Sequence, residues 1–266
     1  MTRLPVAAFA ALVAATVAAF FVTQHLKVST PLIAGTPSPL PAWINPVSTN
    51  RCWIGTPAGK RLTSFNQMKI SFYLLHRSDH VDVYVVDSSG ATVRTLASDR
   101  YMQGGAHPVR SLFTWDGREA NGKVAPDGSY YIRVALLAQN RTVDIADPSG
   151  QAEPVTVKTV PPHPVITSVT PGSISAPASV AIRYQGTENN AARILLYRPR
   201  GSGKPRLVKS FGTPAGFSQA VWDGRIHERP ASPGRYLIGL EVTDQACNTG
   251  YFPSPGTVSP VSVRVR

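Results

Sequence analysis

The tetrapeptide Trp-Asp-Gly-Arg occurs twice in this chain of 266 residues, beginning at Trp115 and again at Trp222. In both copies a proline follows the tryptophan by 11 residues, and a glycine and a tyrosine that heads an apolar strand come next. The two tryptophans are 107 residues apart. Similarity at a fixed offset is typical of tandem structural units. The chain is therefore predicted to contain two copies of one β-domain.

Each copy has the pattern of a turn followed by a half-buried strand. Aspartate favours the start of a turn, and glycine tolerates a positive φ. Apolar residues then alternate along residues 130–136 and 236–242, which indicates one buried face of an antiparallel sheet. The predicted core motif comprises Trp115, Asp116, Gly117, Pro126, Gly128 and Tyr130, and then Trp222, Asp223, Gly224, Pro233, Gly234 and Tyr236.

A ligand platform for sugar or calcium is the alternative for this motif. The calcium-loop pattern Asp-x-[Asp/Asn]-x-[Asp/Asn]-Gly is absent from both copies. A residue set present in two domains of one chain is more simply explained by a shared folding need. We therefore expect the two tryptophans to be core residues.

The first copy carries a wider pattern. Residues 70–74 read Ile-Ser-Phe-Tyr-Leu, and residues 81–96 form two apolar runs around an Asp-Ser-Ser-Gly turn. Together with the tryptophan motif, this pattern resembles the Ig-like domain of the flagellar hook-capping protein, the FlgD-type Ig-like domain. The resemblance covers residues 62–140 well and residues 178–265 less well. It implies a β-sandwich with a structural or binding role and no catalytic residues, and hook assembly does not carry over.

The expected fold is all-β, with two tandem Ig-like or fibronectin-III-like antiparallel β-sandwiches after one N-terminal hydrophobic helix. Twenty-four prolines and 21 glycines suit a chain of short strands and many turns. Two units of about 100 residues are each long enough for a sandwich core. The predicted segments are a signal-anchor or signal peptide at 1–27, a proline-rich spacer with a docking segment at 28–58, and sandwiches at 59–160 and 161–266.

Residues 4–26 are mostly apolar, and no charge lies between Arg3 and Lys27. At about 1.5 Å per residue, a helix of this length could cross the ~30 Å hydrocarbon core of a membrane. We expect an anchor in the cytoplasmic membrane, with extracytoplasmic domains. A cleaved signal peptide and a secreted product is the alternative.

The chain is strongly basic, with 27 lysines and arginines against 15 acidic residues. A basic surface attracts anionic polymers. Partners of this kind would be an anionic cell-wall polymer or another envelope protein, and no nucleic-acid motif accompanies the charge. The alternative is a solvated strand edge that cations protect from pairing. The strongest series is Arg193, Arg198, Arg200, Lys204, Arg206 and Lys209.

No catalytic constellation is evident. The six histidines are scattered without zinc-binding spacing, and the nucleophile-elbow pattern Gly-x-Ser-x-Gly is absent. No metal and no cofactor is expected. The leading hypothesis is a non-catalytic, exported, membrane-anchored protein that acts as a structural, adhesive or scaffolding module at the bacterial cell envelope. The alternative is an accessory module that binds substrate for, or positions, an extracytoplasmic hydrolase.

The only two cysteines are Cys52 and Cys247. An exported chain meets an oxidising environment, where an even number of cysteines favours pairing. Cys52 lies beside Trp53 in a patch too apolar for a plain linker, and Cys247 follows the strand headed by Tyr236. We predict an intramolecular disulfide between them. Two buried thiols and an intermolecular bridge are the alternatives.

Overall fold

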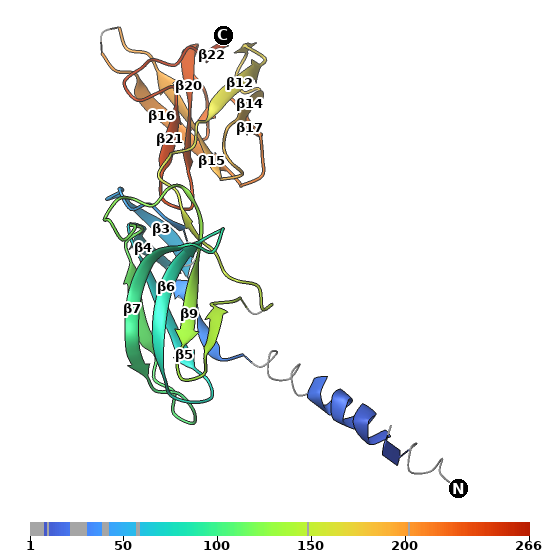
Figure 1. Cartoon of the computed structure of the whole chain (residues 1–266). Helices are drawn as coiled ribbons and strands as arrows, with labels where there is room; N and C mark the ends of the chain where they lie inside the picture. Colours follow the sequence, from blue (N-terminus) through green and yellow to red (C-terminus); the bar gives the residue numbers. More distant parts are fainter. Residues whose placement is uncertain are drawn as a thin grey trace. The chain divides into compact units, whose positions relative to one another are not determined.

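The computed structural model describes residues 8–9, 11–21, 31–38, 43–56, 59–147, 149–201 and 203–266. Residues 8–9 and 11–21 are helical, and the remaining regular structure in the described ranges consists of strands β1 to β22 (Figure 1). The predicted all-β fold, with one helix near the N-terminus, is therefore confirmed.

The strands before residue 160 build two sheets and a separate hairpin. A three-stranded sheet has the order β1-β5-β8, and a larger sheet has the order β2-β11-β9-β6-β7, with β10 paired to β9. Strands β3 and β4 pair only with each other. These strands are β1 (Ile33–Ser38), β2 (Trp43–Ile44), β3 (Arg51–Thr56), β4 (Gly59–Ser64), β5 (Met68–Leu74), β6 (Asp79–Asp87), β7 (Thr92–Met102), β8 (Ser111–Trp115), β9 (Gly128–Leu136), β10 (Arg141–Asp144) and β11 (Val155–Val157).

The strands after residue 160 repeat this arrangement. A three-stranded sheet has the order β12-β14-β17, and a larger sheet has the order β13-β22-β20-β15-β16, with β21 paired to β20. We call these strands, residues 165–265, the second sandwich. They are β12 (Val165–Thr170), β13 (Ser173–Ile174), β14 (Val180–Gln185), β15 (Ala192–Arg198), β16 (Arg206–Thr213), β17 (Gln219–Trp222), β18 (Arg225–Ile226), β19 (Arg229–Pro230), β20 (Gly234–Thr243), β21 (Thr249–Phe252) and β22 (Ser262–Val265).

Each of the two larger sheets contains one parallel pair. Strand β2 runs parallel to β11, and β13 runs parallel to β22. Strands β2 and β13 have two residues each, too few for an alternating pattern to indicate the direction of a neighbouring strand. Strands β1, β2 and β3 lie in the segment 28–58 that was predicted as a spacer with a docking segment.

The core of the second sandwich follows the alternation along β20. Tyr236, Ile238, Leu240 and Val242 are at most 2% exposed and pack in one hydrophobic cluster with Trp222 and side chains of β14, β15 and β22. The opposite face of β20 was expected to meet solvent. Leu237 lies on that face, yet it is only 3% exposed. Something therefore covers part of the outer face of this sheet.

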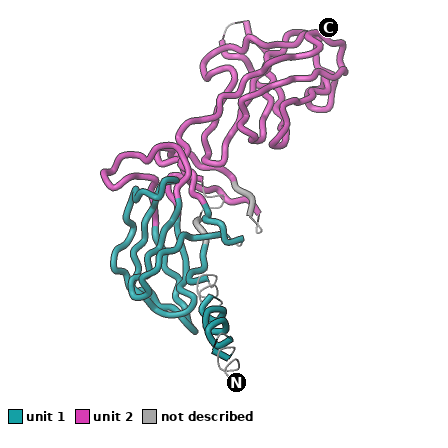
Figure 2. Tube along the Cα trace, turned by 45° about the vertical axis from the view of Figure 1, so that its right-hand side comes forward, with its two compact units in different colours: residues 1–37, 69–113, 131–153 teal, residues 38–68, 114–130, 154–266 magenta. Residues whose placement is uncertain are grey.

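The described chain divides into two compact units (Figure 2). The first comprises residues 1–37, 69–113 and 131–153, and the second comprises residues 38–68, 114–130 and 154–266. The second unit therefore holds both tryptophan motifs, both cysteines and the whole second sandwich. The domain boundaries predicted from the sequence stay predictions.

The helical residues near the N-terminus fall in the predicted anchor. Residues 4–7, 10 and 22–26 of that anchor lie outside the described residues. Within the described ranges, no helix reaches the length and apolarity needed to span a membrane. The exposed large side chains of the helical stretch are Phe9, Leu12, Val13, Val17, Phe20 and Phe21.

Candidate functional site

Equivalent hydrogen bonds form within both tryptophan motifs. The indole Nε1 of Trp115 donates to the carbonyl of Arg118 at 2.9 Å, and that of Trp222 donates to the carbonyl of Arg225 at 2.9 Å. Each indole packs on the motif tyrosine, with centroids 5.1 Å apart for Trp115 and Tyr130 and 5.3 Å apart for Trp222 and Tyr236. Both tryptophans are 1% exposed, so neither indole offers a face to a ligand.

The two motif tyrosines also make equivalent bonds. Tyr130 Oη donates to the carbonyl of Pro126 at 2.7 Å, and Tyr236 Oη donates to the carbonyl of Ser232 at 2.9 Å. In each case the acceptor lies four residues upstream, which resembles the tyrosine corner of Ig-like sandwiches. The buried polar tip of the ring is thereby satisfied, and the chain entering the strand is pinned.

The Asp-Gly turns explain why glycine stands in both motifs. Gly117 and Gly224 have φ of 70° and 69°, a left-handed conformation that glycine adopts without strain. A Cβ at Gly117 would lie 2.2 Å from Pro46 Cγ, and one at Gly224 would lie 2.6 Å from the carbonyl oxygen of Ala178. The aspartate before each glycine accepts a hydrogen bond from the amide two residues on.

The second motif is held by two cations from the β15–β16 hairpin. The Arg198 guanidinium lies 4.9 Å from the Tyr236 ring centroid and donates to Tyr236 Oη at 2.9 Å and to the carbonyl of Pro233 at 3.0 Å. Lys209 Nζ donates to Asp223 Oδ1 at 2.9 Å and to the carbonyl of Arg225 at 2.8 Å. These two side chains act in the fold of the second sandwich.

The electrostatics of Asp223 reflect this contact. Partial burial raises the pKa of the Asp223 carboxyl, but the hydrogen bond from Lys209, the Arg225 amide and the Lys209 charge together lower it. The net pKa is below the ordinary value of an aspartate. The ionised form is thus favoured in the folded protein.

The structure contains the predicted disulfide between Cys52 and Cys247, with Cα atoms 5.8 Å apart and a sequence separation of 195. No free cysteine remains. Cys52 lies in β3, and Cys247 lies in the turn between β20 and β21. Both cysteines belong to the second compact unit, so the bond fixes the β3–β4 hairpin to this turn.

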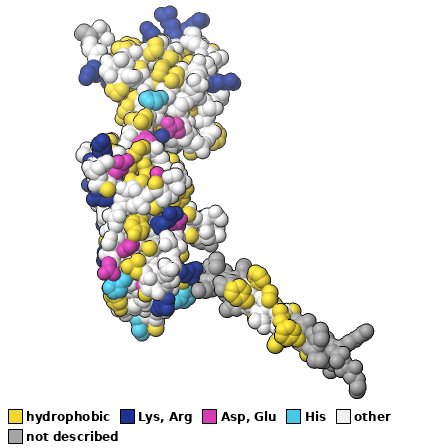
Figure 3. Space-filling model, viewed as in Figure 1, with side chains coloured by type: hydrophobic (Ala, Val, Ile, Leu, Met, Phe, Trp, Pro, Cys, Tyr) yellow, Lys and Arg dark blue, Asp and Glu magenta, His cyan; other side chains and the backbone are white. Residues whose placement is uncertain are grey.

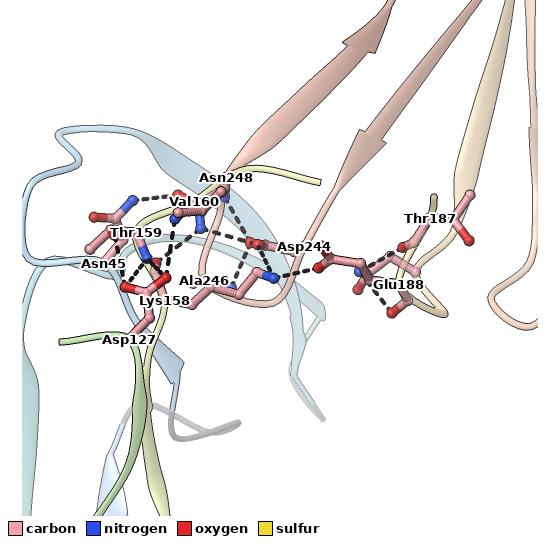
Figure 4. A network of polar contacts seen from close by, with 11 residues as sticks. Asn45, Asp127, Lys158, Thr159, Val160, Thr187, Glu188, Asp244, Ala246 and Asn248 are labelled. Carbon is pink, nitrogen blue, oxygen red and sulfur yellow. Dashed lines mark hydrogen bonds and ion pairs between the residues drawn. The ribbon is translucent and has the colours of Figure 1, made fainter. Parts of the chain in front are cut away.

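A polar network surrounds the turn that carries Cys247 (Figure 4). Asp244 Oδ1 accepts from the amides of Ala246 and Asn248 at 3.0 Å and 2.9 Å. Asn248 Nδ2 donates to Asp244 Oδ2 and to the carbonyl of Lys158, both at 3.0 Å. Asn248 Oδ1 accepts from Asn45 Nδ2. Segments far apart in the sequence therefore meet at this turn.

The network contains a buried charge with a compensating cation. The Asp244 side chain is 2% exposed, and Lys158 Nζ lies 3.9 Å from its Oδ2 while also contacting Glu188. Burying a carboxylate is costly unless it is paired and hydrogen-bonded, and Asp244 meets both conditions. The backbone is also tightly packed here, because a Cβ at Gly250 would lie 1.8 Å from the carbonyl oxygen of Pro162. The proline-rich stretch after Lys158 is thus held in place by the turn.

The residues of the predicted anionic-polymer series fall into two groups in the structure, those with protein partners and those that are exposed. Arg198 and Lys209 are engaged in the second motif, and Arg193 lies 3.5 Å from Glu241 in an ion pair. Arg200, Lys204 and Arg206 are exposed and have no hydrogen-bond or ion-pair partner among the described residues. They flank the turn of the β15–β16 hairpin, and Figure 3 shows lysine and arginine side chains gathered at this end of the second sandwich.

A groove lined by one of these cations, Lys204, opens on the outer face of the second sandwich. Its volume is about 660 Å³. Its floor contains Leu195 and Leu237, and its walls include the aromatic side chains of Tyr197, Tyr251 and Phe252. Lys204 lies at its rim. Residues 253–259 line the groove together with Leu237.

The loop of residues 253–259 is held to itself and to β20. Thr257 Oγ1 donates to the carbonyl of Ser254 at 2.7 Å, and Ser259 Oγ donates to the carbonyl of Ile238 at 2.6 Å. Gly239 in β20 leaves space for the Tyr197 ring, whose Cε2 would lie 3.2 Å from a Cβ at that position. The groove was not found from the sequence, because only tertiary contacts bring the loop over the strands.

No group of three or more histidine, cysteine, aspartate or glutamate side chains suited to a metal ion occurs in the part of the chain that the structure describes. His76 and His80, which flank a bend, have separate partners. His76 Nε2 contacts the carbonyl of Pro31 at 2.7 Å, and His80 Nδ1 lies 2.9 Å from Asp99 Oδ1.

Residues 59–140 match the model of the FlgD Ig-like domain family. The basal-body rod modification protein FlgD of Salmonella typhimurium is 36% identical over 63 residues, which cover 24% of this chain and 24% of that protein; the Salmonella typhi protein matches equally. The chain thus spans about a quarter of the length of these relatives. This similarity points to a non-enzymatic structural module, and the family match does not extend to the second sandwich.

Two solved structures were compared over most of the chain. The human OSCAR ligand-binding domain has a TM-score of 0.36 and 15% identity, covering 83% of this chain and 93% of that one. Dimeric latent PorU from Porphyromonas gingivalis has a TM-score of 0.31 and 12% identity, covering 82% of this chain and 20% of that one. Scores this low carry no argument about function.

Proposed function

We propose that this protein is a non-catalytic scaffolding or adhesive module of the bacterial cell envelope, exported and anchored in the cytoplasmic membrane by residues 4–26. The observation that carries the proposal is the disulfide between Cys52 and Cys247. Stable disulfides form in oxidising compartments outside the cytoplasm. A bond of this span, with the polar network around Asp244, suits a protein whose parts must keep their positions under load.

The composition of the N-terminus supports the membrane part of the proposal. Its uncharged run ends at Lys27, and the large apolar side chains of the helical residues are exposed in the structure. Exposed phenylalanines and leucines on a helix are favourable in a lipid environment. The similarity of residues 59–140 to a flagellar Ig-like domain supports a structural role.

Fractionation combined with thiol labelling tests this function. The native protein is extracted in the presence of an alkylating maleimide reagent, and its mass is compared with and without prior reduction. We expect an unlabelled, oxidised protein in the membrane fraction that resists high salt and is digested by protease added to spheroplasts. A labelled, reduced protein in the cytosolic fraction would overturn the proposal, and a mature N-terminus beyond residue 27 would replace the anchor by a cleaved signal peptide.

A further inference from the structure

The groove of the second sandwich combines three properties that suit a ligand site. It is concave and about 660 Å³ in volume, within the ~300–1,000 Å³ typical of ligand sites. It has aromatic walls, with Tyr251 still 42% exposed. Three exposed cations, Arg200, Lys204 and Arg206, lie on the hairpin that borders it.

The polar groups of the groove are available to a ligand. The hydroxyls of Tyr197 and Tyr251 have no hydrogen-bond partner within the described ranges, whereas the neighbouring hydroxyls of Thr257 and Ser259 are engaged in holding the loop. Burial and then the charge of Glu241 raise the pKa of Tyr197, so its hydroxyl remains a donor at neutral pH.

A sugar ring matches this surface because it has apolar C–H faces and a rim of hydroxyl groups. The aromatic walls can pack against the apolar C–H faces. The phenol hydroxyls and backbone groups can form hydrogen bonds with the sugar hydroxyls. The charge of Lys204 then favours a chain that carries negative charge. We propose that this groove binds an acidic glycan, with rings against Tyr197 and Tyr251 and an anionic group at Lys204.

The geometry disfavours two other polymers. A single nucleic-acid strand requires cations that track its backbone, and Lys204 is the one cation that lines this groove in the described structure. A peptide that adds to a sheet requires a free strand edge. The floor strands are not edges, because β15 pairs with β16 and β20, and β20 pairs with β15, β21 and β22.

The inference rests on the proposed function only in that the glycan would be met outside the cell. The test is therefore made on purified protein, independently of localisation. The full chain in neutral detergent is titrated by calorimetry with hexagalacturonate, which carries carboxylates, with a ribitol-phosphate oligomer, which carries phosphates, and with uncharged maltohexaose. An uncharged proline-rich peptide is the fourth probe, because such peptides also bind aromatic grooves.

We expect at least one acidic oligomer to bind more tightly than maltohexaose, and the two acidic probes distinguish a carboxylate from a phosphate source. Lys204→Gln should weaken acidic binding about fivefold. Tyr251→Ala should weaken it up to about tenfold, and it should also weaken any binding of maltohexaose. Lys123→Gln, at an exposed lysine in the loop of the first motif, is the control with the same net charge and should leave binding unchanged.

Equal losses for Lys204→Gln and Lys123→Gln would show diffuse charge attraction and overturn the site. Absence of binding by both acidic oligomers, or tighter binding of the proline-rich peptide, would overturn it as well. None of these outcomes bears on whether the protein is exported and oxidised, so failure of this inference is distinguishable from failure of the proposed function.

Discussion

The two tryptophan motifs share a frame but differ in what holds them. Both have the indole bond to a backbone carbonyl, the tyrosine bond four residues upstream and the left-handed glycine. At the second, Arg198 and Lys209 from outside the motif also bind it. A Cβ at Gly234 would lie 2.7 Å from Arg198 Nη2, whereas one at Gly128 would meet no described atom within 4 Å.

This difference teaches that a shared sequence signature can be reinforced by different neighbours. The frame comes from residues inside the motif, which explains why it recurs with the motif. The reinforcing cations come from β15 and β16, outside it. Residues that a count of charges assigns to one basic surface can therefore be divided between folding contacts and exposed positions.

The largest expected effect comes from the disulfide at the turn between β20 and β21. The turn between β9 and β10, at the equivalent place after the first motif, has no disulfide, because the chain contains only two cysteines. Replacing Cys52 and Cys247 together with serine should lower the free energy of unfolding by up to about 5 kcal/mol, because the unfolded chain loses a long closed loop. Urea unfolding of wild type with and without reductant, beside the double variant, measures this. An unchanged midpoint would mean that the polar network alone holds the turn.

Trp115→Ala and Trp222→Ala remove the indole hydrogen bond of their motifs. Each should lower the free energy of unfolding by about 3–5 kcal/mol, because each removes a fully buried large side chain. Equal losses of unfolding free energy in the two variants would support an equivalent structural role for the two motifs. The measurement is urea unfolding followed by circular dichroism, since tryptophan fluorescence changes with the substitution itself. If either variant kept wild-type stability, that motif would not be a core element.

Arg198→Gln sharpens the comparison, because it removes a side chain from outside the second motif that binds Tyr236 and the carbonyl of Pro233. The loss of the ring contact with Tyr236 and of three charged hydrogen bonds, to Tyr236 and to the carbonyls of Ser232 and Pro233, should lower the free energy of unfolding by about 1–2 kcal/mol. The control is Arg200→Gln on the same hairpin, which should change stability by less than about 0.5 kcal/mol. Equal effects from the two variants would contradict a structural role for Arg198.

The smallest effect is a dependence on pH. The folded pKa of Asp223 is depressed, so its contribution to stability is present above the unfolded pKa and is lost as pH falls through the folded value. Asp223 is 57% exposed in its side chain, so the contribution should be small. Thermal unfolding between about pH 6 and about pH 3 should show a slightly flatter decline for both Asp223→Asn and Lys209→Gln. An unaltered pH profile in both would argue against the Lys209 contact.

Much of the fold could be read from local pattern. Alternation along β20 identified the face formed by Tyr236, Ile238 and Leu240, since side chains on a strand point in turn to its two sides. The burial of Leu237 on the opposite face could not be predicted, because this residue lies in a groove that residues 253–259 also line. That loop has no periodicity that links it to β20.

Some features of the candidate site were likewise predictable from the sequence, and others were not. The cationic series was visible as composition, and the cysteine pair was visible as an even count. The aromatic groove was not visible, because Tyr197, Tyr251 and Lys204 come from separate strands and a turn.

By itself the sequence determined the local structure of this protein: the tandem motif, the turns that require glycine, and the strands whose apolar residues alternate. These features depend on sterics and on side-chain direction over a few residues. Tertiary structure alone decided which cations fold the second motif and which stay exposed, how the turn at Asp244 is satisfied, and where the outer face of the sheet is hollow. Each of these depends on contacts between residues far apart in the chain, for which local pattern contains no information.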